Sequence, residues 1–522
     1  MKHKVHQQQR LEASSRSLIQ PFGEVCFENE SLRLGDHWDN YYFEHLRFVA
    51  ESLDPEKYLI VGRRGSGKSS LLEHFKYQTR YKNAGCIIVN NDHDYYEEMF
   101  RVSSELHVQS SRLKKLVSVW EHVFWQLAFT KLREREPRLD NVLDPIEEHA
   151  GFASIVKSVV AGVLSKFAME NASAVIDAVS KRLQSTRMVE AREMALAVTS
   201  KYPLFIAIDS REQYEVRSQE EMQITAALIE CASRFNLQYA GRGLHIKVCV
   251  ADEVFPYIKE DAISNTAKHI RDPLFITWRP KDLMRLICWR LHKYLVTVGL
   301  PHISEQEVNW DSFEDIHAKI WLRHFDEKLL NRCGIEERSW PYVLRHTHLK
   351  PRQLVQLCNR IARLAGERNE FPRFTGATIR DAVRQCEVDL ADELINSYRS
   401  VYPRIGEIIS ALEGAPVEFK ANFLDRMAHR TAGQWPDRTY SAYEFKKLVM
   451  ELGVVGRRRG YTDEKTCILR ADFEYFFDDR LYLTESDHCV IHPMFFAKLN
   501  INRNDPKRIC IYPFPESKEF IN

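Results

Sequence analysis

Five short apolar runs alternate with longer segments of helical pattern in the first half of the chain. The runs are KYLIV, CIIV, PLFIAI, HIKVCV and LFIT, at residues 57–61, 86–89, 203–208, 245–250 and 274–277. Continuous apolar runs of this length are typical of strands that are buried on both faces. Strands that alternate with helices predict an α/β fold, in which helices cover both faces of a parallel sheet.

A long helical stretch interrupts this alternation between the second and third runs. Residues 95–200 show helical periodicity and no strand pattern. One helical face gathers apolar side chains at spacings of three and four residues: Trp120, Val123, Phe124, Leu127 and Ala128. We interpret this stretch as a helical insertion between strands of the sheet.

The second half of the chain predicts a helical lid followed by a mixed domain. The pattern is helical over 281–365, and a boundary is expected at 371–375, FPRFT. Beyond it, helices are predicted at 376–412, 420–427 and 442–452, and a hairpin is predicted from 453–459 and 466–473 around a turn at 460–463. Helices followed by a two-stranded hairpin suggest a winged helix. The expected domains are a tail at 1–35, an α/β core at 36–280, a lid at 281–372 and a winged-helix-like domain at 373–522.

Composition fits several ordinary globular domains and points to no particular partner. The chain has 522 residues, too many for one core, with 44% hydrophobic and 28% charged residues. A net charge of +1 implies no global attraction to nucleic acid or to membranes. The 11 cysteines include no C-x-x-C pair, the longest apolar stretch (152–169) contains two lysines, and the N-terminus lacks a signal-peptide core. We therefore expect a cytoplasmic protein with no membrane span.

The segment GRRGSGKS, residues 62–69, matches the phosphate-loop pattern G-x-x-x-x-G-K-[ST]. It follows an apolar strand and opens a helix predicted from residue 68, which is the context that this motif requires. Glycines let backbone N–H groups point at phosphate oxygens, the lysine reaches the β- and γ-phosphates, and the serine hydroxyl can bind Mg²⁺. We assign nucleoside triphosphate binding to Gly62, Arg63, Arg64, Gly65, Ser66, Gly67, Lys68, Ser69 and Ser70.

The Mg²⁺ site needs a carboxylate at the end of another buried strand, and Asp209 closes the run PLFIAI. The alternative is that Asp209 caps a helix N-terminus. The group that orients the attacking water is often the next acid, but residue 210 is serine. Glu212 could take this role or could be a solvated glutamate in the first turn of a helix. The sequence thus predicts nucleotide binding and leaves hydrolysis open.

Several motifs together resemble those of bacterial P-loop ATPases of the AAA+/STAND division, with a layout like that of origin-recognition ATPases. They are LIVGRRGSGKSSLL, SVWEHVFWQL, LFIAIDSREQYE, KVCVADEVFPYI, FITWRPKDLMRLICWRL, LKPRQLVQLCNRIARLA and IHPMF, spread over residues 40–500. The resemblance implies an AAA+ core, a helical lid and a C-terminal winged helix. It also implies that the nucleotide is ATP and that the state of the bound nucleotide controls assembly or partner binding. A further implication is a role in anti-phage defence.

The resemblance carries three further residues over by position. Arg352 matches the lid arginine that senses the γ-phosphate, Arg271 matches a finger that reaches a neighbour's nucleotide, and Asp252 stands where a polar sensor is expected. A helix-start arginine and a surface arginine are the alternatives for the first two. Members of the group usually carry paired acids where this chain has Asp209-Ser210, which favours a slow switch over rapid turnover.

Basic residues near the predicted hairpin suggest a nucleic-acid contact. Arg457, Arg458 and Arg459 are expected at the tip of the wing, with Lys446 and Lys447 on the preceding helix. Such residues could bind phosphates, but six acidic residues follow closely, and winged helices also bind proteins.

Three functions remain open at this point. The first is an ATP-dependent switch that controls its own assembly or an effector protein. The second is a DNA-dependent ATPase that binds nucleic acid through the winged helix. The third is a nucleotide-stabilised scaffold without turnover.

Overall fold

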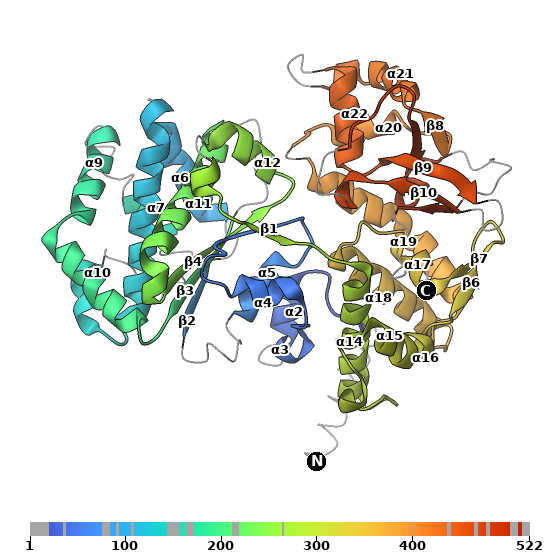
Figure 1. The fold of residues 1–522 in the computed structure, drawn as a ribbon, viewed down its shortest axis with the longest axis horizontal. Coiled ribbons are helices and arrows are strands. Elements are labelled where there is room, and N and C mark those ends of the chain that lie inside the picture. Colours follow the sequence, from blue (N-terminus) through green and yellow to red (C-terminus); the bar gives the residue numbers. More distant parts are fainter. Residues whose placement is uncertain are drawn as a thin grey trace. The chain divides into compact units, whose positions relative to one another are not determined.

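The computed structural model describes the chain in segments that form two compact units (Figure 1). The described residues are 20–34, 38–75, 84–89, 93–105, 109–143, 156–157, 159–162, 172–210, 219–263, 266–399, 401–435, 440–463, 468–476, 481–501 and 510–513. The sheet unit comprises Glu44–Thr277. The second unit comprises Trp278–Asn522 together with the N-terminal segment up to Phe43.

A five-stranded parallel sheet forms the centre of the sheet unit. The strands are β1 (Leu59–Gly62), β2 (Gly85–Val89), β3 (Leu204–Asp209), β4 (Leu244–Ala251) and β5 (Leu274–Ile276). Their order is β2-β3-β4-β1-β5, and every neighbouring pair is parallel. All five predicted strands are confirmed, and the α/β fold class with them. In this order, β1, the strand that precedes the glycine loop, lies between β4 and β5.

The helices of the sheet unit include the predicted insertion. They are α4 (Arg47–Ser52), α5 (Lys68–His74), α6 (His93–Glu105), α7 (Gln109–Leu132), η3 (Pro137–Val142), α9 (Ala172–Leu183), α10 (Thr186–Thr199), α11 (Gln219–Tyr239), η4 (Ala240–Arg242), α12 (Phe255–Tyr257), η5 (Ile258–Ala262) and α13 (Thr266–His269). Between β2 and β3 the described residues are helical or irregular, which confirms the insertion.

Helix α7 is more deeply buried than an amphipathic helix would be. Every residue from 122 to 129 is buried, on both sides of the predicted apolar face. The reason is a second aromatic set: Trp125 of α7 packs against Phe235 and Tyr239 of α11, with ring centroids 5.1 Å apart in both pairs. The insertion therefore shares one core with the sheet.

The second unit contains the predicted lid helices and an unpredicted hairpin. Its first helices are α14 (Pro280–Val298), η6 (Glu305–Glu307), α15 (Phe313–Ile316), η7 (His317–Trp321), α16 (Leu322–His324), α17 (Ser339–Leu344), α18 (Pro351–Glu367) and α19 (Gly376–Ser397). Strands β6 (Lys328–Leu330) and β7 (Glu336–Arg338) pair antiparallel inside the stretch expected to be helical. Each strand has only three residues and buries only its middle one, so no apolar alternation marks it.

Residues 20–43, which were expected as a tail and as the start of the core, form part of the second unit. They include α2 (Phe27–Leu34) and α3 (Trp38–Tyr41). The backbone N–H of Phe22 donates to Asn359 Oδ1 at 3.1 Å, and the buried Glu30 carboxylate pairs with Arg290 at 2.8 Å. The boundary expected at 371–375 does not divide the two compact units.

A mixed five-stranded sheet forms the C-terminal part of the second unit. Its strands are β8 (Glu418–Lys420), β9 (Val455–Asp463), β10 (Ile468–Asp472), β11 (His488–Ile491) and β12 (Cys510–Tyr512), in the order β12-β10-β9-β11-β8. The helices are α20 (Ile405–Ser410), α21 (Asn422–Arg430), η8 (Ala432–Gln434), α22 (Ala442–Glu451), η10 (Glu474–Phe476) and η11 (Pro493–Phe495). The antiparallel pairing of β9 with β10 confirms the hairpin. However, β9 continues through 460–463, where a turn was expected. The single helix expected over 376–412 is instead two helices, α19 and α20, with an interruption between them.

None of the helices in the described part of the chain is long and apolar enough to cross a membrane.

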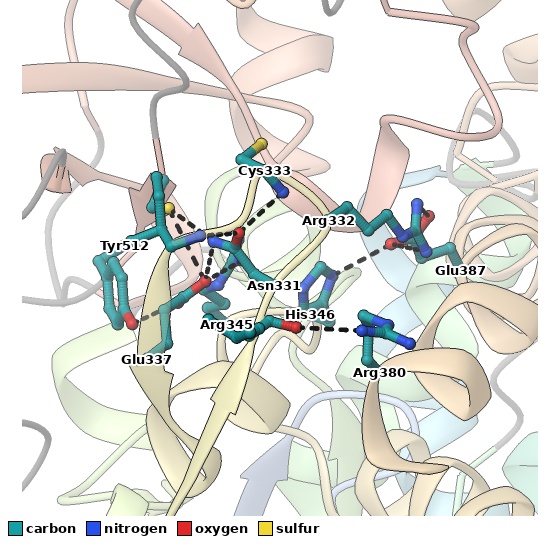
Figure 2. Close-up of polar contacts among 12 residues, drawn as sticks. Asn331, Arg332, Cys333, Glu337, Arg345, His346, Arg380, Glu387 and Tyr512 are labelled. Carbon is teal, nitrogen blue, oxygen red and sulfur yellow. Dashed lines mark hydrogen bonds and ion pairs between the residues drawn. The ribbon is translucent and has the colours of Figure 1, made fainter. Parts of the chain in front are cut away.

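A buried polar network joins the last strand to the β6–β7 hairpin (Figure 2). Glu337 on β7 is 5% exposed, and its carboxylate lies among four donors, one of which is the Cys510 thiol at 3.7 Å. Its Oε1 accepts from Arg345 Nη2 at 2.9 Å and from Asn331 Nδ2 at 2.5 Å, while its Oε2 accepts from Tyr512 Oη at 2.5 Å. Burial raises the pKa of the Tyr512 hydroxyl well above its usual range, so this group donates at every ordinary pH.

We expect the substitution Glu337→Ala to destabilise the second unit by about 3–5 kcal/mol, because it leaves the buried Arg345 guanidinium without its carboxylate. Urea unfolding followed by tryptophan fluorescence measures this loss. Glu336→Ala on the same strand is the matched control, since Glu336 pairs with Lys328 at the surface, where solvent screens the pair. Similar unfolding midpoints for the two variants would contradict the role given to Glu337.

Candidate nucleotide-binding site

The glycines of the phosphate loop (residues 62–69) occupy positions that other residues fit poorly. Gly65 and Gly67 have φ values of 78° and 95°, in the left-handed region that favours glycine. At Gly62, a Cβ atom would lie 2.6 Å from Ser66 Oγ and 3.2 Å from Ile276 Cβ. The loop therefore has the tight backbone that the motif predicts, between the end of β1 and the start of α5.

The Lys68 side chain lies back across the start of the loop. It is 4% exposed, and its Nζ donates to the backbone carbonyls of Gly62 at 2.9 Å and Arg63 at 3.3 Å. A buried ammonium group is tolerated only where it has such acceptors. The ammonium is thus fixed beside the loop, where the motif requires a positive charge for phosphate.

The structure brings Ser69 and Asp209 together, although they are 140 residues apart in the sequence. Ser69 Oγ donates to Asp209 Oδ2 at 2.7 Å, and Asp209 is buried at the end of β3. Oxygen atoms of this kind suit Mg²⁺, which is usually bound through one or two protein ligands, water and substrate phosphates. Within the described ranges, no cluster of three His, Cys, Asp or Glu residues could hold a metal ion. The Ser69 hydroxyl and the Asp209 carboxylate are donors that would fit Mg²⁺ bound together with a nucleotide.

The position after Asp209 carries no acid. Ser210 is buried, and its backbone N–H donates to Cys249 O at 3.0 Å. Glu212, the predicted candidate for orienting water, lies outside the described residues. Its role stays a prediction.

A buried carboxylate that the sequence analysis missed contacts the phosphate loop. Glu253 is 4% exposed, and the backbone N–H of Arg64 donates to its Oε1 at 3.0 Å and its Oε2 at 3.2 Å. The adjacent Asp252, expected as a polar sensor, donates its backbone N–H to Gly62 O at 3.1 Å. Only the position just after the fourth apolar run could have pointed to Glu253.

The two arginines carried over by resemblance have local partners. The exposed Arg271 precedes β5, and its Nε donates to Lys268 O at 3.1 Å. Arg352 lies in the first turn of α18, in the second unit, with Nη1 3.7 Å from Glu393 Oε1. Their expected contacts with a nucleotide stay predictions.

The arginines predicted at the tip of the wing lie instead within the sheet. Residues 457–459 are paired with β10 over 470–472, and Asp472 lies 3.5 Å from Arg457 Nη2 and 2.5 Å from Arg459 Nε. Arg458 forms an ion pair with Glu418. On α22, Lys446 Nζ lies 2.7 Å from Asp425 Oδ1. The prediction that Arg457, Arg458 and Arg459 lie at the tip of the wing was wrong, because β9 continues to Asp463 and keeps them inside the paired strand.

A parallel sheet in this order, with a glycine loop between β1 and α5 and a carboxylate at the end of β3, defines the P-loop class of folds. No protein-family model matches the sequence, and no curated protein matches it. One solved structure to which the chain is similar is the Aeropyrum pernix ORC2 protein in its ADP form. The identity is 12%, the TM-score is 0.27, and the match covers 86% of this chain and 87% of that chain. A likeness at this level says nothing about activity.

We expect Gly67→Ala to destabilise the nucleotide-free protein by about 1–2 kcal/mol. The left-handed backbone conformation costs free energy for any residue with a Cβ atom, even though no neighbouring atom would contact a Cβ at this position. Gly241→Ala is the matched control, since a Cβ meets nothing within 4 Å at either glycine and only Gly67 has a positive φ. Urea unfolding midpoints compare the two. If Gly241→Ala lost as much stability as Gly67→Ala, the left-handed backbone of the loop would not be the reason for glycine at position 67.

Proposed function

We propose that this chain binds ATP with Mg²⁺ on the phosphate loop and acts as a nucleotide-dependent switch of AAA+/STAND type. The observation that carries the proposal is the meeting of Lys68, Ser69 and Asp209 around one glycine loop. These groups supply two things that a nucleoside triphosphate with Mg²⁺ needs, which are a positive charge and hard oxygen ligands. Adenine as the base rests on the resemblance of the sequence motifs.

The absence of an acid at position 210 supports a switch with slow turnover. Phosphoryl transfer to water needs a group that orients the attacking molecule, and Ser210 has no carboxylate with which to do this. A site that binds tightly and hydrolyses slowly keeps its nucleotide long enough to control assembly or an effector protein. A role in anti-phage defence rests on the resemblance, and the geometry adds nothing to it.

Nucleic-acid binding through the C-terminal domain is the weaker proposal. The order of α20, β8, α21, α22, β9 and β10 suits a winged helix. Yet Arg457, Arg458, Arg459 and Lys446 already face carboxylates of the same domain, so a phosphate backbone would have to displace these ion pairs.

We expect Lys68→Ala to weaken ATP binding about 10- to 100-fold, which corresponds to the loss of a charge-assisted hydrogen bond of about 1.5–3 kcal/mol. Equilibrium dialysis with labelled ATP and Mg²⁺ measures the affinity. Lys131→Ala is the control, because Lys131 pairs with Glu134 on the surface of α7. Unchanged affinity in Lys68→Ala would remove the phosphate loop as the site.

If the switch works by self-assembly, the mass of the protein particle in solution changes when the nucleotide binds. We expect sedimentation of the wild-type protein to show a larger species with ATP and Mg²⁺ than without, and Lys68→Ala to lack this response. The same species under both conditions would contradict control of self-assembly and leave control of a partner as the form of the switch.

A further inference from the structure

The carboxylate of Glu253 contacts the phosphate loop in a way that the proposed function does not yet use. It is one of four buried acidic groups in the described part of the sheet unit, and a buried carboxylate is costly unless hydrogen bonds stabilise it. The Arg64 N–H is within hydrogen-bond distance of both its oxygens, at 3.0 and 3.2 Å. Hydrogen bonds from a backbone N–H to an ionised group are stronger than neutral ones.

The turn that carries Glu253 is itself fixed to the loop. Strand β4 pairs with β1, and Ala251 stands opposite Gly62 at the end of this register. One residue further, the N–H of Asp252 donates to Gly62 O at 3.1 Å. The two contacts together set the position of the Glu253 backbone relative to the loop, so the carboxylate reaches Arg64 from a rigid strand end.

The start of the loop is therefore held from two directions. Lys68 donates to the carbonyls of Gly62 and Arg63, and the N–H of Ser66 also donates to Arg63 O at 3.0 Å. Glu253 accepts from the next polar group along the backbone, the N–H of Arg64. Three consecutive residues thus have their backbone polar groups fixed before any nucleotide arrives.

We propose that Glu253 is a positioning residue for the nucleotide site: its carboxylate holds the Arg64 amide and so presets the loop for phosphate. This proposal rests on the proposed function for its consequence, which is tighter nucleotide binding. Preorganisation of this kind raises affinity because less conformational entropy is lost on binding. The loop geometry itself does not depend on that function.

Two substitutions separate positioning from a role of the charge in catalysis. Glu253→Ala removes the acceptor and leaves the Arg64 N–H without it. Glu253→Gln keeps an acceptor oxygen and nearly the same shape but removes the negative charge. If Glu253 positions the loop, we expect Glu253→Gln to behave like the wild-type protein. If the carboxylate orients or deprotonates water, we expect Glu253→Gln to lose ATP turnover.

The test measures hydrogen exchange of the peptide that contains residues 62–69 in nucleotide-free protein, and ATP affinity by equilibrium dialysis with Mg²⁺. We expect Glu253→Ala to speed exchange of the loop by about tenfold and to weaken ATP binding by about tenfold. Glu253→Gln is expected to stay within about twofold of wild type in both. Glu260→Ala, an exposed glutamate in the same connection, is the control that should change neither. Melting temperatures confirm that each variant is folded.

Loop exchange in Glu253→Ala equal to that of wild type would overturn the proposal. The proposal would also be overturned if Glu253→Gln bound ATP as weakly as Glu253→Ala. It would be overturned as well if Glu253→Gln bound ATP normally but lost turnover. Either result assigns the effect to the negative charge of Glu253. If the wild type does not bind ATP, the proposed function fails, while the exchange data still decide whether Glu253 holds the loop.

Discussion

The Lys68 ammonium group and the backbone carbonyls of Gly62 and Arg63 form the interaction on which the nucleotide-binding site depends. A glycine loop that leaves its N–H groups for phosphate has to be held by other contacts, because its own backbone forms no regular ladder. Lys68 supplies such a contact from α5, and Glu253 supplies another from the end of β4. The Ser69–Asp209 hydrogen bond then connects the loop to β3.

Much of this unit could be predicted because buried parallel strands leave a strong signal in the sequence. The strands β1, β3 and β4 are buried along their whole length, so each shows as a nearly continuous apolar run, as in LFIAI before Asp209. The loop motif is equally readable, since Gly67 and Lys68 are required by backbone geometry and charge. Asp209 followed from its place at a strand end, and the structure puts it beside Ser69.

The features that could not be predicted depend on contacts between distant segments. Glu337 is buried in a strand whose sequence is charged, and donors from other segments, among them Arg345 and Tyr512, make that burial tolerable. The same holds for Arg457 and Arg459, whose partner Asp472 lies on the neighbouring strand. The N-terminal segment looked like a tail because the partner of Glu30, Arg290, is 260 residues away. Charge in a sequence does not reveal whether it faces solvent or a buried counterion.

The nucleotide-binding site described above is expected to take one nucleoside triphosphate together with Mg²⁺. Isothermal titration of the wild-type protein with ATP, with Mg²⁺ and then with a chelator in its place, tests it most directly. We expect one site per chain in Mg²⁺ and an affinity weakened about tenfold or more in the chelator, because Ser69 and Asp209 are the residues that would hold the ion and the ion would offset the charge of the phosphates. Binding that is absent, or that is equally strong without Mg²⁺, would contradict it.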